Sequence, residues 1–222
     1  MNINYYHIKF LQVLIFFFCT SSCVVIAQDP NRFEEEIERI AKLPFPAEKD
    51  IVVFTGSSSI RFWEDVQMDC GGDHVINTGF GGSHMSDLLY HLDKTVLRFK
   101  PKVVYIYEGD NDVAAGKAPN DIMRTTKATV NAILAANKET KIYFISAKPS
   151  PSRWEFKEQY NAFNALLEAY CEEHENLTYM DVWNPMLEAN GRPKPSIFIA
   201  DSLHMNREGY LIWRDVICRS TK

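Results

Sequence analysis

The chain reads Ile51-Val52-Val53-Phe54-Thr55-Gly56-Ser57-Ser58-Ser59, an apolar run that ends abruptly in a glycine and three serines. A short continuous apolar run rich in β-branched residues is typical of a strand that is buried on both faces. Glycine and serine are favoured in turns, where their conformational freedom and hydroxyl groups are used. The stretch therefore predicts a buried strand that delivers serine hydroxyl groups to a turn.

Similar apolar runs recur along the chain, and stretches with helical periodicity separate them. Buried strands that alternate with amphipathic helices predict a parallel sheet, because right-handed crossovers place helices on both faces of it. We therefore expect an α/β fold, a three-layer α/β/α sandwich with a five-stranded parallel sheet. The predicted strands are Ile51–Phe54, His74–Asn77, Val103–Tyr107, Ile142–Ser146 and Leu177–Val182.

The expected helices each carry one apolar face. An opening helix is predicted with Asp29 as its cap and Pro30 at its first position, and a final helix follows the cap Asn206. The proline-rich stretch 148–154 predicts a stiff loop after the fourth strand. The apolar faces comprise Phe33, Ile37 and Ile40; Met85, Leu88, Leu89, Leu92 and Val96; Ile122, Thr126, Val130 and Ile133; Phe156, Tyr160, Phe163, Leu167 and Tyr170; and Tyr210, Trp213 and Ile217.

The first 27 residues have the pattern of a secretion signal. Lys9 is their one Lys, Arg, Asp or Glu residue, and an apolar core and small residues follow it up to Ala27. The apolar core of about 10 residues is shorter than the roughly 20 that span a bilayer. We expect cleavage after Ala27 and a secreted or periplasmic protein. An uncleaved anchor is one alternative, and a lipoprotein attached through Cys23 is another, although residues 20–22 lack the leucine usual in lipoprotein signals.

Cleavage after Ala27 leaves 222 − 27 = 195 residues, which suits a single domain over 28–222. The whole chain has a net charge of −5 and no basic run, so nucleic acid is not an expected partner. The sequence leaves the oligomeric state open. Cys70, Cys171 and Cys218 form an odd set without metal-type spacing, which predicts buried free thiols and not a disulfide framework.

Four polar clusters lie where a parallel sheet binds its ligands, beyond the carboxyl ends of its strands. Gly56–Ser59, Gly79–Ser83 and Gly109–Asp112 follow the first three strands, and Asp201–His204 precedes the final helix. A serine hydroxyl becomes a good nucleophile when an imidazole takes its proton and a carboxylate orients that imidazole. Asp201, three residues before His204, supplies such a pair, so the chain is predicted to be a serine hydrolase.

Other hydrolytic and nucleotide motifs are missing from the sequence. It contains neither a Gly-x-Ser-x-Gly elbow nor a His-Glu-x-x-His zinc motif. The glycines at 79, 81 and 82 fail the dinucleotide fingerprint, because His84 occupies its third glycine position. We therefore expect no metal and no cofactor.

The blocks, taken in this order from Ile51 to Trp213, resemble the SGNH or GDSL-type serine esterases. The resemblance implies a flavodoxin-like SGNH hydrolase fold with Ser58 as the nucleophile and Asp201 and His204 as its partners. Trp63, five residues after Ser58, fits the family's first block, whereas Ser57 replaces the family's aspartate. Ser59 is the alternative nucleophile.

The resemblance also implies an oxyanion hole, the set of donors that stabilises negative charge on the substrate oxygen. The amides of Ser58 and Gly82 and the side chain of Asn111 would form it, with Gly81 as the alternative to Gly82. Asp110 and Asp112 are interpreted as solvated loop carboxylates or helix caps without catalytic roles. Residues that we expect to line the substrate pocket are His84, Arg153 and Trp154.

The expected function is hydrolysis of carboxylic esters through an acyl-enzyme. A secretion signal and the absence of a hydrophobic lid insertion favour short acyl groups, above all acetyl, on carbohydrates or similar polar molecules. The alternatives are a lysophospholipase or thioesterase, a transacylase, and a catalytically silent module that binds glycans or a protein. The change at Ser57 motivates the last of these.

Overall fold

A parallel five-stranded sheet forms the centre of the protein, seen in a computed structural model that describes residues 32–46 and 50–218. Its strand order is β2-β1-β3-β4-β5, so the chain reverses direction across the sheet between β2 and β3. All five predicted strands are confirmed, with ends that agree to within two residues. They are β1 (Val52–Gly56), β2 (Val75–Asn77), β3 (Val103–Tyr107), β4 (Lys141–Ile145) and β5 (Leu177–Met180).

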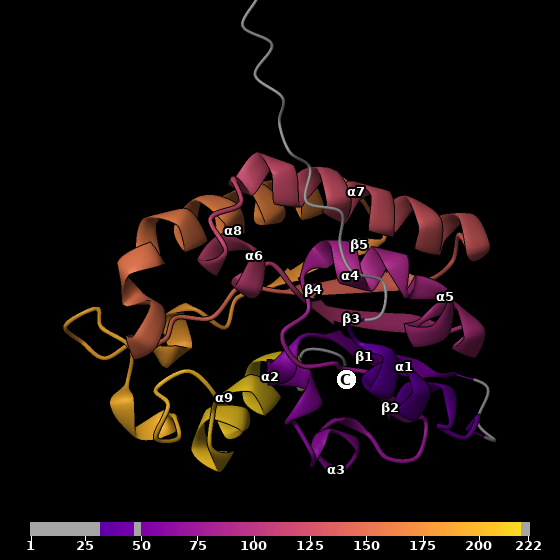
Figure 1. Cartoon of the computed structure of the whole chain (residues 1–222), viewed down its shortest axis with the longest axis horizontal. Coiled ribbons are helices and arrows are strands. Elements are labelled where there is room, and N and C mark those ends of the chain that lie inside the picture. The colour runs from indigo at the N-terminus through magenta and orange to yellow at the C-terminus, as the bar shows by residue number, and fades with distance from the viewer. Residues whose placement is uncertain (1–31, 47–49, 219–222) are drawn as a thin grey trace, which may run out of the picture.

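Helices cover both faces of the sheet, as the three-layer prediction requires (Figure 1). One layer contains α1 (Glu34–Ala41), α4 (Met85–Tyr90), α5 (Leu92–Thr95), α7 (Pro119–Ala136) and α8 (Lys157–Glu172). The other contains α2 (Ser58–Arg61), α3 (Val66–Cys70) and α9 (Arg207–Ile217). A short helix, α6 (Asp110–Ala114), follows β3, and the 3-10 turns are η1 (Leu97–Phe99), η2 (Pro151–Phe156), η3 (Asn184–Met186) and η4 (Pro195–Ile197).

Two hydrophobic cores lie on opposite faces of the sheet, because successive strand residues point to opposite sides. In β1, Val53 packs against the α7 and α8 layer, and its neighbour Phe54 packs against the α9 layer. Phe54 stacks on Tyr105 of β3, with ring centroids 4.3 Å apart. Both faces are therefore closed to water, and the carboxyl edge of the sheet is left for chemistry.

The helix predicted across residues 85–96 is interrupted. His91 has φ −98° and ψ 13°, values that end α4 and separate it from α5. The opening helix begins at Glu34, with Phe33 as its N-cap, whereas the predicted cap Asp29 and Pro30 lie outside the described residues. The final helix starts as predicted, and the N–H of Gly209 donates to Oδ1 of Asn206 at 3.2 Å.

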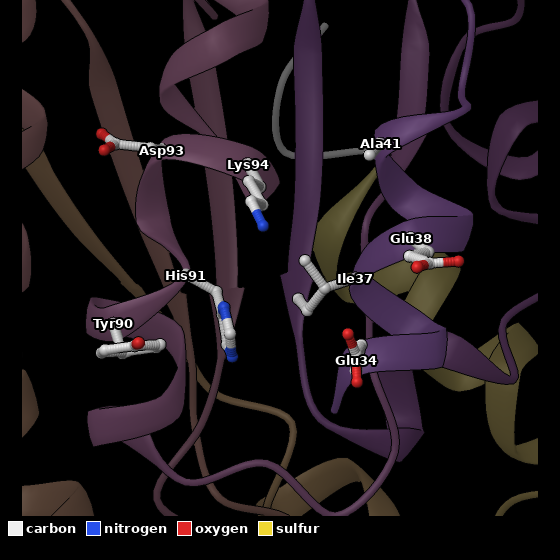
Figure 2. A pocket seen from close by; sticks show the side chains of 8 residues that line it. All are labelled: Glu34, Ile37, Glu38, Ala41, Tyr90, His91, Asp93 and Lys94. Carbon is white, nitrogen blue, oxygen red and sulfur yellow. The ribbon is translucent and has the colours of Figure 1, made fainter. Parts of the chain in front are cut away.

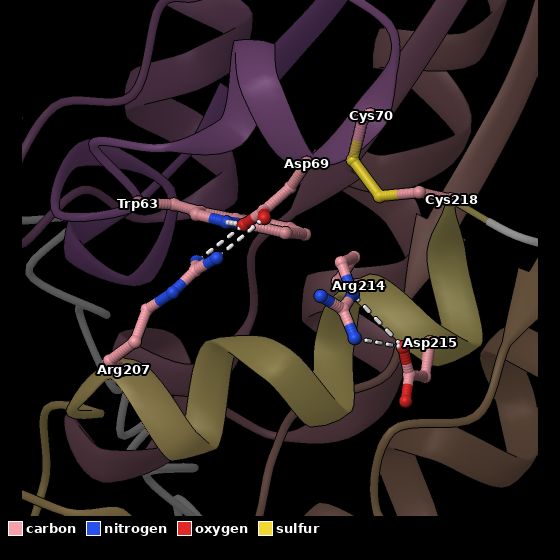
Figure 3. Close-up of a disulfide and its surroundings, with 7 residues drawn as sticks. All are labelled: Trp63, Asp69, Cys70, Arg207, Arg214, Asp215 and Cys218. Atoms are coloured by element: carbon pink, nitrogen blue, oxygen red, sulfur yellow. Dashed lines mark hydrogen bonds and ion pairs between the residues drawn. A yellow bond between two sulfur atoms is a disulfide. The ribbon is translucent and has the colours of Figure 1, made fainter.

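The expectation of three free thiols is wrong. Cys70 at the end of α3 and Cys218 after α9 form a disulfide (Figure 3). Their Cα atoms are 4.9 Å apart, within the range that a disulfide spans. Packing of α3 against α9 brings the two ends together across 148 residues, which sequence spacing does not reveal. Cys171 is the free thiol among the described cysteines, and it is buried.

An ion pair lies beside the disulfide and joins the same two helices. Arg207 at the start of α9 donates to both carboxylate oxygens of Asp69 in α3, at 2.6 and 2.7 Å. The indole N–H of Trp63 also donates to Asp69, at 2.8 Å. Helix α9 is thus tied to α3 near both of its ends (Figure 3).

The predicted signal segment, its cleavage point after Ala27 and Cys23 lie outside the described residues. Within the part of the chain that is described, no helix combines the length and apolarity needed to cross a bilayer.

Candidate active site

The serine turn after β1 depends on a glycine. Gly56 has φ +126°, and a Cβ placed on it would lie 2.0 Å from the carbonyl oxygen of Tyr107 in β3. The strands therefore approach closely here, and the N–H of Ser57 donates to that carbonyl at 3.0 Å. Ser57 and the alternative nucleophile Ser59 are buried, with 1% and 2% of their surface exposed, whereas Ser58 is half-buried.

Ser58, His204 and Asp201 are brought together, as predicted. Nε2 of His204 lies 2.9 Å from Oγ of Ser58, and Nδ1 lies 2.6 Å from Oδ2 of Asp201. The serine and the histidine are 146 residues apart in the chain. The resulting order, carboxylate to imidazole to hydroxyl, is the geometry that activates a serine.

The loop that carries Asp201 and His204 is fixed by its own hydrogen bonds. Oδ1 of Asp201 accepts the N–H groups of Leu203 and His204, each at 2.9 Å. Ser202 between them has φ +58°, and its carbonyl accepts the N–H of Ser152 at 3.1 Å. Burial opposes ionisation of Asp201, but the hydrogen bonds from His204 and Leu203 prevail and lower its pKa to about 2. Asp201 is therefore an anion at neutral pH.

The glycine-rich loop after β2 lies against the serine turn. A Cβ placed on Gly81 would be 4.0 Å from Cβ of Ser58, and Gly82 has φ +77°. Asn111 joins the same loop, because its Nδ2 donates to the carbonyl of Ser83 at 2.8 Å. The predicted oxyanion-hole residues Ser58, Gly82 and Asn111 thus belong to one connected group of turns.

Helix α1 also holds this loop, a role that the sequence pattern did not indicate. Arg39 donates to the carbonyl of Gly79 at 2.7 Å, and Arg32, just before α1, donates to the carbonyl of Gly82 at 2.9 Å. Glu36 accepts from Arg39 at 2.9 Å and from Arg61 of α2 at 3.0 Å. One helix is therefore bonded both to the glycine-rich loop and to the serine-bearing helix.

Asp110 is not a solvated loop carboxylate, since only 4% of its surface is exposed. Its oxygens accept the hydroxyl of Tyr107 at 2.7 Å, the hydroxyl of Tyr160 at 2.9 Å and a guanidinium N–H of Arg153. The buried ammonium of Lys148 lies 3.5 Å away. Burial opposes its ionisation, but the charges of Lys148 and Arg153 and the tyrosine hydrogen bonds lower the pKa of Asp110 to about 2.

Asp112 is buried as well, and it links three segments. Its carboxylate accepts the N–H of Met85 at the start of α4 at 2.9 Å and pairs with Lys117 at 2.8 Å. His84, predicted to line the pocket, places Nδ1 3.9 Å from Asp112 and exposes 15% of its side chain. Burial lowers the pKa of His84 despite the nearby Asp112, so its imidazole is neutral at pH 7.

The other two predicted pocket residues have protein partners. Arg153 donates to Asp110 and, at 3.0 Å, to Oδ1 of Asn111. Trp154 stacks on Trp183 with ring centroids 6.0 Å apart, and the guanidinium of Arg192 lies 5.0 Å from its ring centre. Arg153 is therefore tied to the side chain of Asn111, and Trp154 packs the loop before α8.

Glu108, which precedes Gly109, is a buried carboxyl group that the sequence did not single out. The hydroxyl of Ser83 donates to its Oε1 at 2.5 Å. Its Oε2 is buried and has no hydrogen-bond partner among the described residues. Burial first, and then the nearby Asp112, raise the pKa of Glu108 well above its usual value. The charged form of Glu108 is therefore disfavoured in the folded protein.

A cavity of about 490 Å³ lies between α1 and the α4–α5 corner (Figure 2). Ile37 and His91 point toward one another across it in Figure 2, and acidic and basic side chains surround them. None of the predicted site residues lines it. The cavity is therefore separate from the Ser58 site. In the described ranges, no group of three or more His, Cys, Asp or Glu side chains is arranged to hold a metal ion.

Several solved structures share this fold. A GDSL-like lipase from Bacteroides thetaiotaomicron VPI-5482 is 22% identical with a TM-score of 0.73, covering 86% of this chain and 98% of that chain. A lipase/acylhydrolase from Enterococcus faecalis is 21% identical with a TM-score of 0.59, covering 78% and 95%. A carbohydrate esterase family 3 protein from Talaromyces cellulolyticus is 18% identical with a TM-score of 0.62, covering 78% of this chain and 96% of that chain.

No curated protein matches the chain significantly. A family model does: that of the GDSL-like lipase/acylhydrolase family matches residues 53–212, more than half of the 222 residues. The match contains the serine turn, the glycine loop, Asn111 and the loop with Asp201 and His204. The chain belongs to the GDSL-like lipase/acylhydrolase family and is a carboxylic ester hydrolase.

Proposed function

We propose that the protein is a secreted serine esterase that uses Ser58, His204 and Asp201 to remove short acyl groups, chiefly acetyl, from carbohydrates or similar polar molecules. One observation carries the catalytic assignment. His204 contacts Oγ of Ser58 at 2.9 Å through one ring nitrogen and Asp201 at 2.6 Å through the other. A histidine held in this way is poised to accept the serine proton.

In the proposed mechanism, Oγ of Ser58 attacks the ester carbonyl while Nε2 of His204 takes its proton. The tetrahedral intermediate collapses, and His204 returns the proton to the departing alcohol oxygen. The acyl group then remains on Ser58 as an ester. Water, deprotonated by His204, attacks this acyl-enzyme and releases the carboxylic acid and free Ser58. Asp201 stays ionised and stabilises the imidazolium at each step.

Negative charge builds up on the carbonyl oxygen during both attacks. The amides of Ser58 and Gly82 and the side chain of Asn111 are the proposed donors to it, and loss of one such donor typically costs about 10²–10³ in turnover. The position of the loop supports this assignment, since Gly81 lies against Ser58 and Asn111 donates to Ser83.

Two observations favour a substrate whose alcohol part is a carbohydrate. The fold is shared with a carbohydrate esterase family 3 protein, although that likeness is at 18% identity. Phe62 is 48% exposed, and its ring meets that of His204 edge-on at 5.0 Å. Because His204 hands its proton to the leaving alcohol, Phe62 is suited to contact that alcohol, and the apolar face of a sugar ring can pack on an aromatic ring.

The secreted location is supported by two features of the chain. Residues 1–27 have the pattern of a secretion signal. The Cys70–Cys218 disulfide also suits an oxidising compartment, where such bonds persist.

The decisive experiment compares hydrolysis of p-nitrophenyl acetate by the mature protein, Ser58→Ala and Ser59→Ala. We expect Ser58→Ala to lose turnover by about 10³-fold or more, because the nucleophile acts as a unit with its base. Ser59→Ala, a buried neighbour of the same type, should retain most of the turnover. Circular dichroism of all three proteins reports folding.

A fully active Ser58→Ala protein would exclude the proposed nucleophile, and a folded but inactive wild type would favour a silent binding module. Acetyl, butyryl and long-chain p-nitrophenyl esters test the acyl preference, and a best rate on the long chain would favour a lysophospholipase or thioesterase. Release of acetate from acetylated sugars then tests the carbohydrate substrate.

A further inference from the structure

We propose that Arg153 is a positioning residue for Asn111, one that fixes which face of the Asn111 amide is offered to the substrate. This inference rests on the proposed function, since it concerns the oxyanion donor. It differs from the sequence prediction, in which Arg153 lines the substrate pocket. The guanidinium is engaged with the protein on both of its ends, with Asp110 on one and Asn111 on the other.

The amide of Asn111 has two ends of nearly equal shape but opposite polarity. Its Oδ1 accepts Nη2 of Arg153 at 3.0 Å, and its Nδ2 donates to the carbonyl of Ser83 at 2.8 Å. A flipped amide would set its N–H groups against the guanidinium, which has no acceptor. Arg153 therefore keeps Nδ2 on the Ser83 side, where its second N–H is left for the developing oxyanion.

Arg153 is itself held in place by a buried carboxylate. Asp110 accepts a hydrogen bond from Arg153. It also accepts the hydroxyl of Tyr107 at 2.7 Å and the hydroxyl of Tyr160 at 2.9 Å. The planar fork of a guanidinium reaches two acceptors in fixed directions, whereas the single ammonium of a lysine does not. Buried Asp110 therefore fixes the orientation of Arg153, and Arg153 in turn fixes the orientation of the Asn111 amide.

The same cluster allows a clean test. Lys148, which is 1% exposed, lies 3.5 Å from Asp110 and would still neutralise it if Arg153 were removed. Arg153→Met is therefore not expected to leave an unpaired buried charge. Arg153→Lys keeps the positive charge but loses the fork. Arg192 offers a matched control, because its guanidinium also lies in this region, over Trp154, and has no hydrogen bond to Asn111.

The experiment measures kcat and KM for p-nitrophenyl acetate in Arg153→Met, Arg153→Lys, Asn111→Ala, the Asn111→Ala/Arg153→Met double variant and Arg192→Met. Asn111→Ala should lower kcat by about 10²–10³, as for other oxyanion donors. Both Arg153 variants should lower kcat by about 10-fold or more, but by no more than Asn111→Ala does. Their KM should change less than about threefold. In the double variant, Arg153→Met should add almost nothing, because both changes remove one interaction.

Multiplying effects in the double variant, or a rise in KM with kcat unchanged, would overturn the inference and return Arg153 to a substrate-binding role. Wild-type kcat in Arg153→Lys would also overturn it, because that residue cannot supply the fork. Arg192→Met should match the wild type. Failure of the proposed function itself gives a different result. In that case Ser58→Ala would keep its turnover, and neither Asn111 nor Arg153 would have an oxyanion to act on.

Discussion

Three carboxyl groups near the site differ in charge because their surroundings differ. Asp201 and Asp110 have pKa values of about 2, as hydrogen bonds and, for Asp110, two cations outweigh the effect of burial. Glu108 is as buried as Asp110 but has no cation beside it among the described residues, so burial and the nearby Asp112 raise its pKa, and the hydrogen bond from Ser83 does not offset them. Asp201 and Asp110 thus stay charged at neutral pH, whereas the charged form of Glu108 is disfavoured.

Glu108→Gln is predicted to stabilise the protein increasingly as the pH rises. A carboxyl group with a raised folded pKa contributes its full stability below the unfolded value of about 4.3 and loses it as the pH rises toward the folded value. Glutamine resembles the protonated form and does not titrate. The melting temperature of the variant relative to wild type should therefore increase by several degrees between pH 4.5 and pH 8.

Glu139→Gln provides the control, because it makes the same substitution at an exposed position. Its melting temperature should follow that of the wild type across the pH range. A difference for Glu108→Gln that does not grow with pH would show that Glu108 is ionised in the folded protein.

Sequence reasoning at the residue scale found the groups that meet in the site but not those that support them. Ser58, Asn111, Asp201 and His204 stand in blocks with a recognisable order. Asp110 was read as solvated because its partners lie 38 and 43 residues away, at Lys148 and Arg153. An acidic residue in a loop gives no local signal that distant cations will bury it.

At the scale of elements, α1 lies outside the matched family segment yet contacts the site. The family model begins at residue 53, whereas α1 spans Glu34–Ala41. Its apolar face was predicted correctly, since Ile37 and Ile40 are buried. Its polar face gives no comparable pattern, because Glu36 and Arg39 at this spacing also suit a solvated helix surface. The hydrogen bonds of that face to Gly79 and Arg61 required the folded chain to be seen.

Arg39→Met is predicted to destabilise the protein by about 1 kcal/mol, because it removes hydrogen bonds from a partly exposed cation to Gly79 and Glu36. Urea unfolding measures this loss. The looser glycine loop should also lower kcat for p-nitrophenyl acetate several-fold. Lys42→Met is the control, since Lys42 is 79% exposed and pairs with Glu38 at 3.8 Å. Its effect on stability should stay within about 0.5 kcal/mol. Equal effects of the two substitutions would contradict a supporting role for Arg39.

At the scale of the whole molecule, the five parallel strands and the three layers followed from the sequence, whereas the covalent link between α3 and the end of α9 did not. Alternating strands and helices predict a covered parallel sheet, and the chain forms one. An odd number of cysteines, in contrast, fits both three free thiols and one disulfide with a spare thiol. Only the packing of α3 on α9 distinguishes the two.

The mature protein, unfolded without reductant, should show one reactive thiol, that of Cys171, and three after reduction. Linking residues 148 apart restricts the unfolded chain, so loss of the bond should lower the unfolding free energy by about 2–5 kcal/mol. Urea unfolding of Cys70→Ser/Cys218→Ser measures this loss. Three thiols before reduction would exclude the bond.

The Cys70–Cys218 bond also makes the chain between these residues a closed ring, with Ser58 outside it and both Asp201 and His204 inside it. A protease that cuts one exposed turn in the ring, such as that around Gly191, opens the ring without releasing a fragment. The two pieces stay joined through sulfur, and the sheet and both cores still hold them in register. A single nick there is therefore compatible with a surviving enzyme.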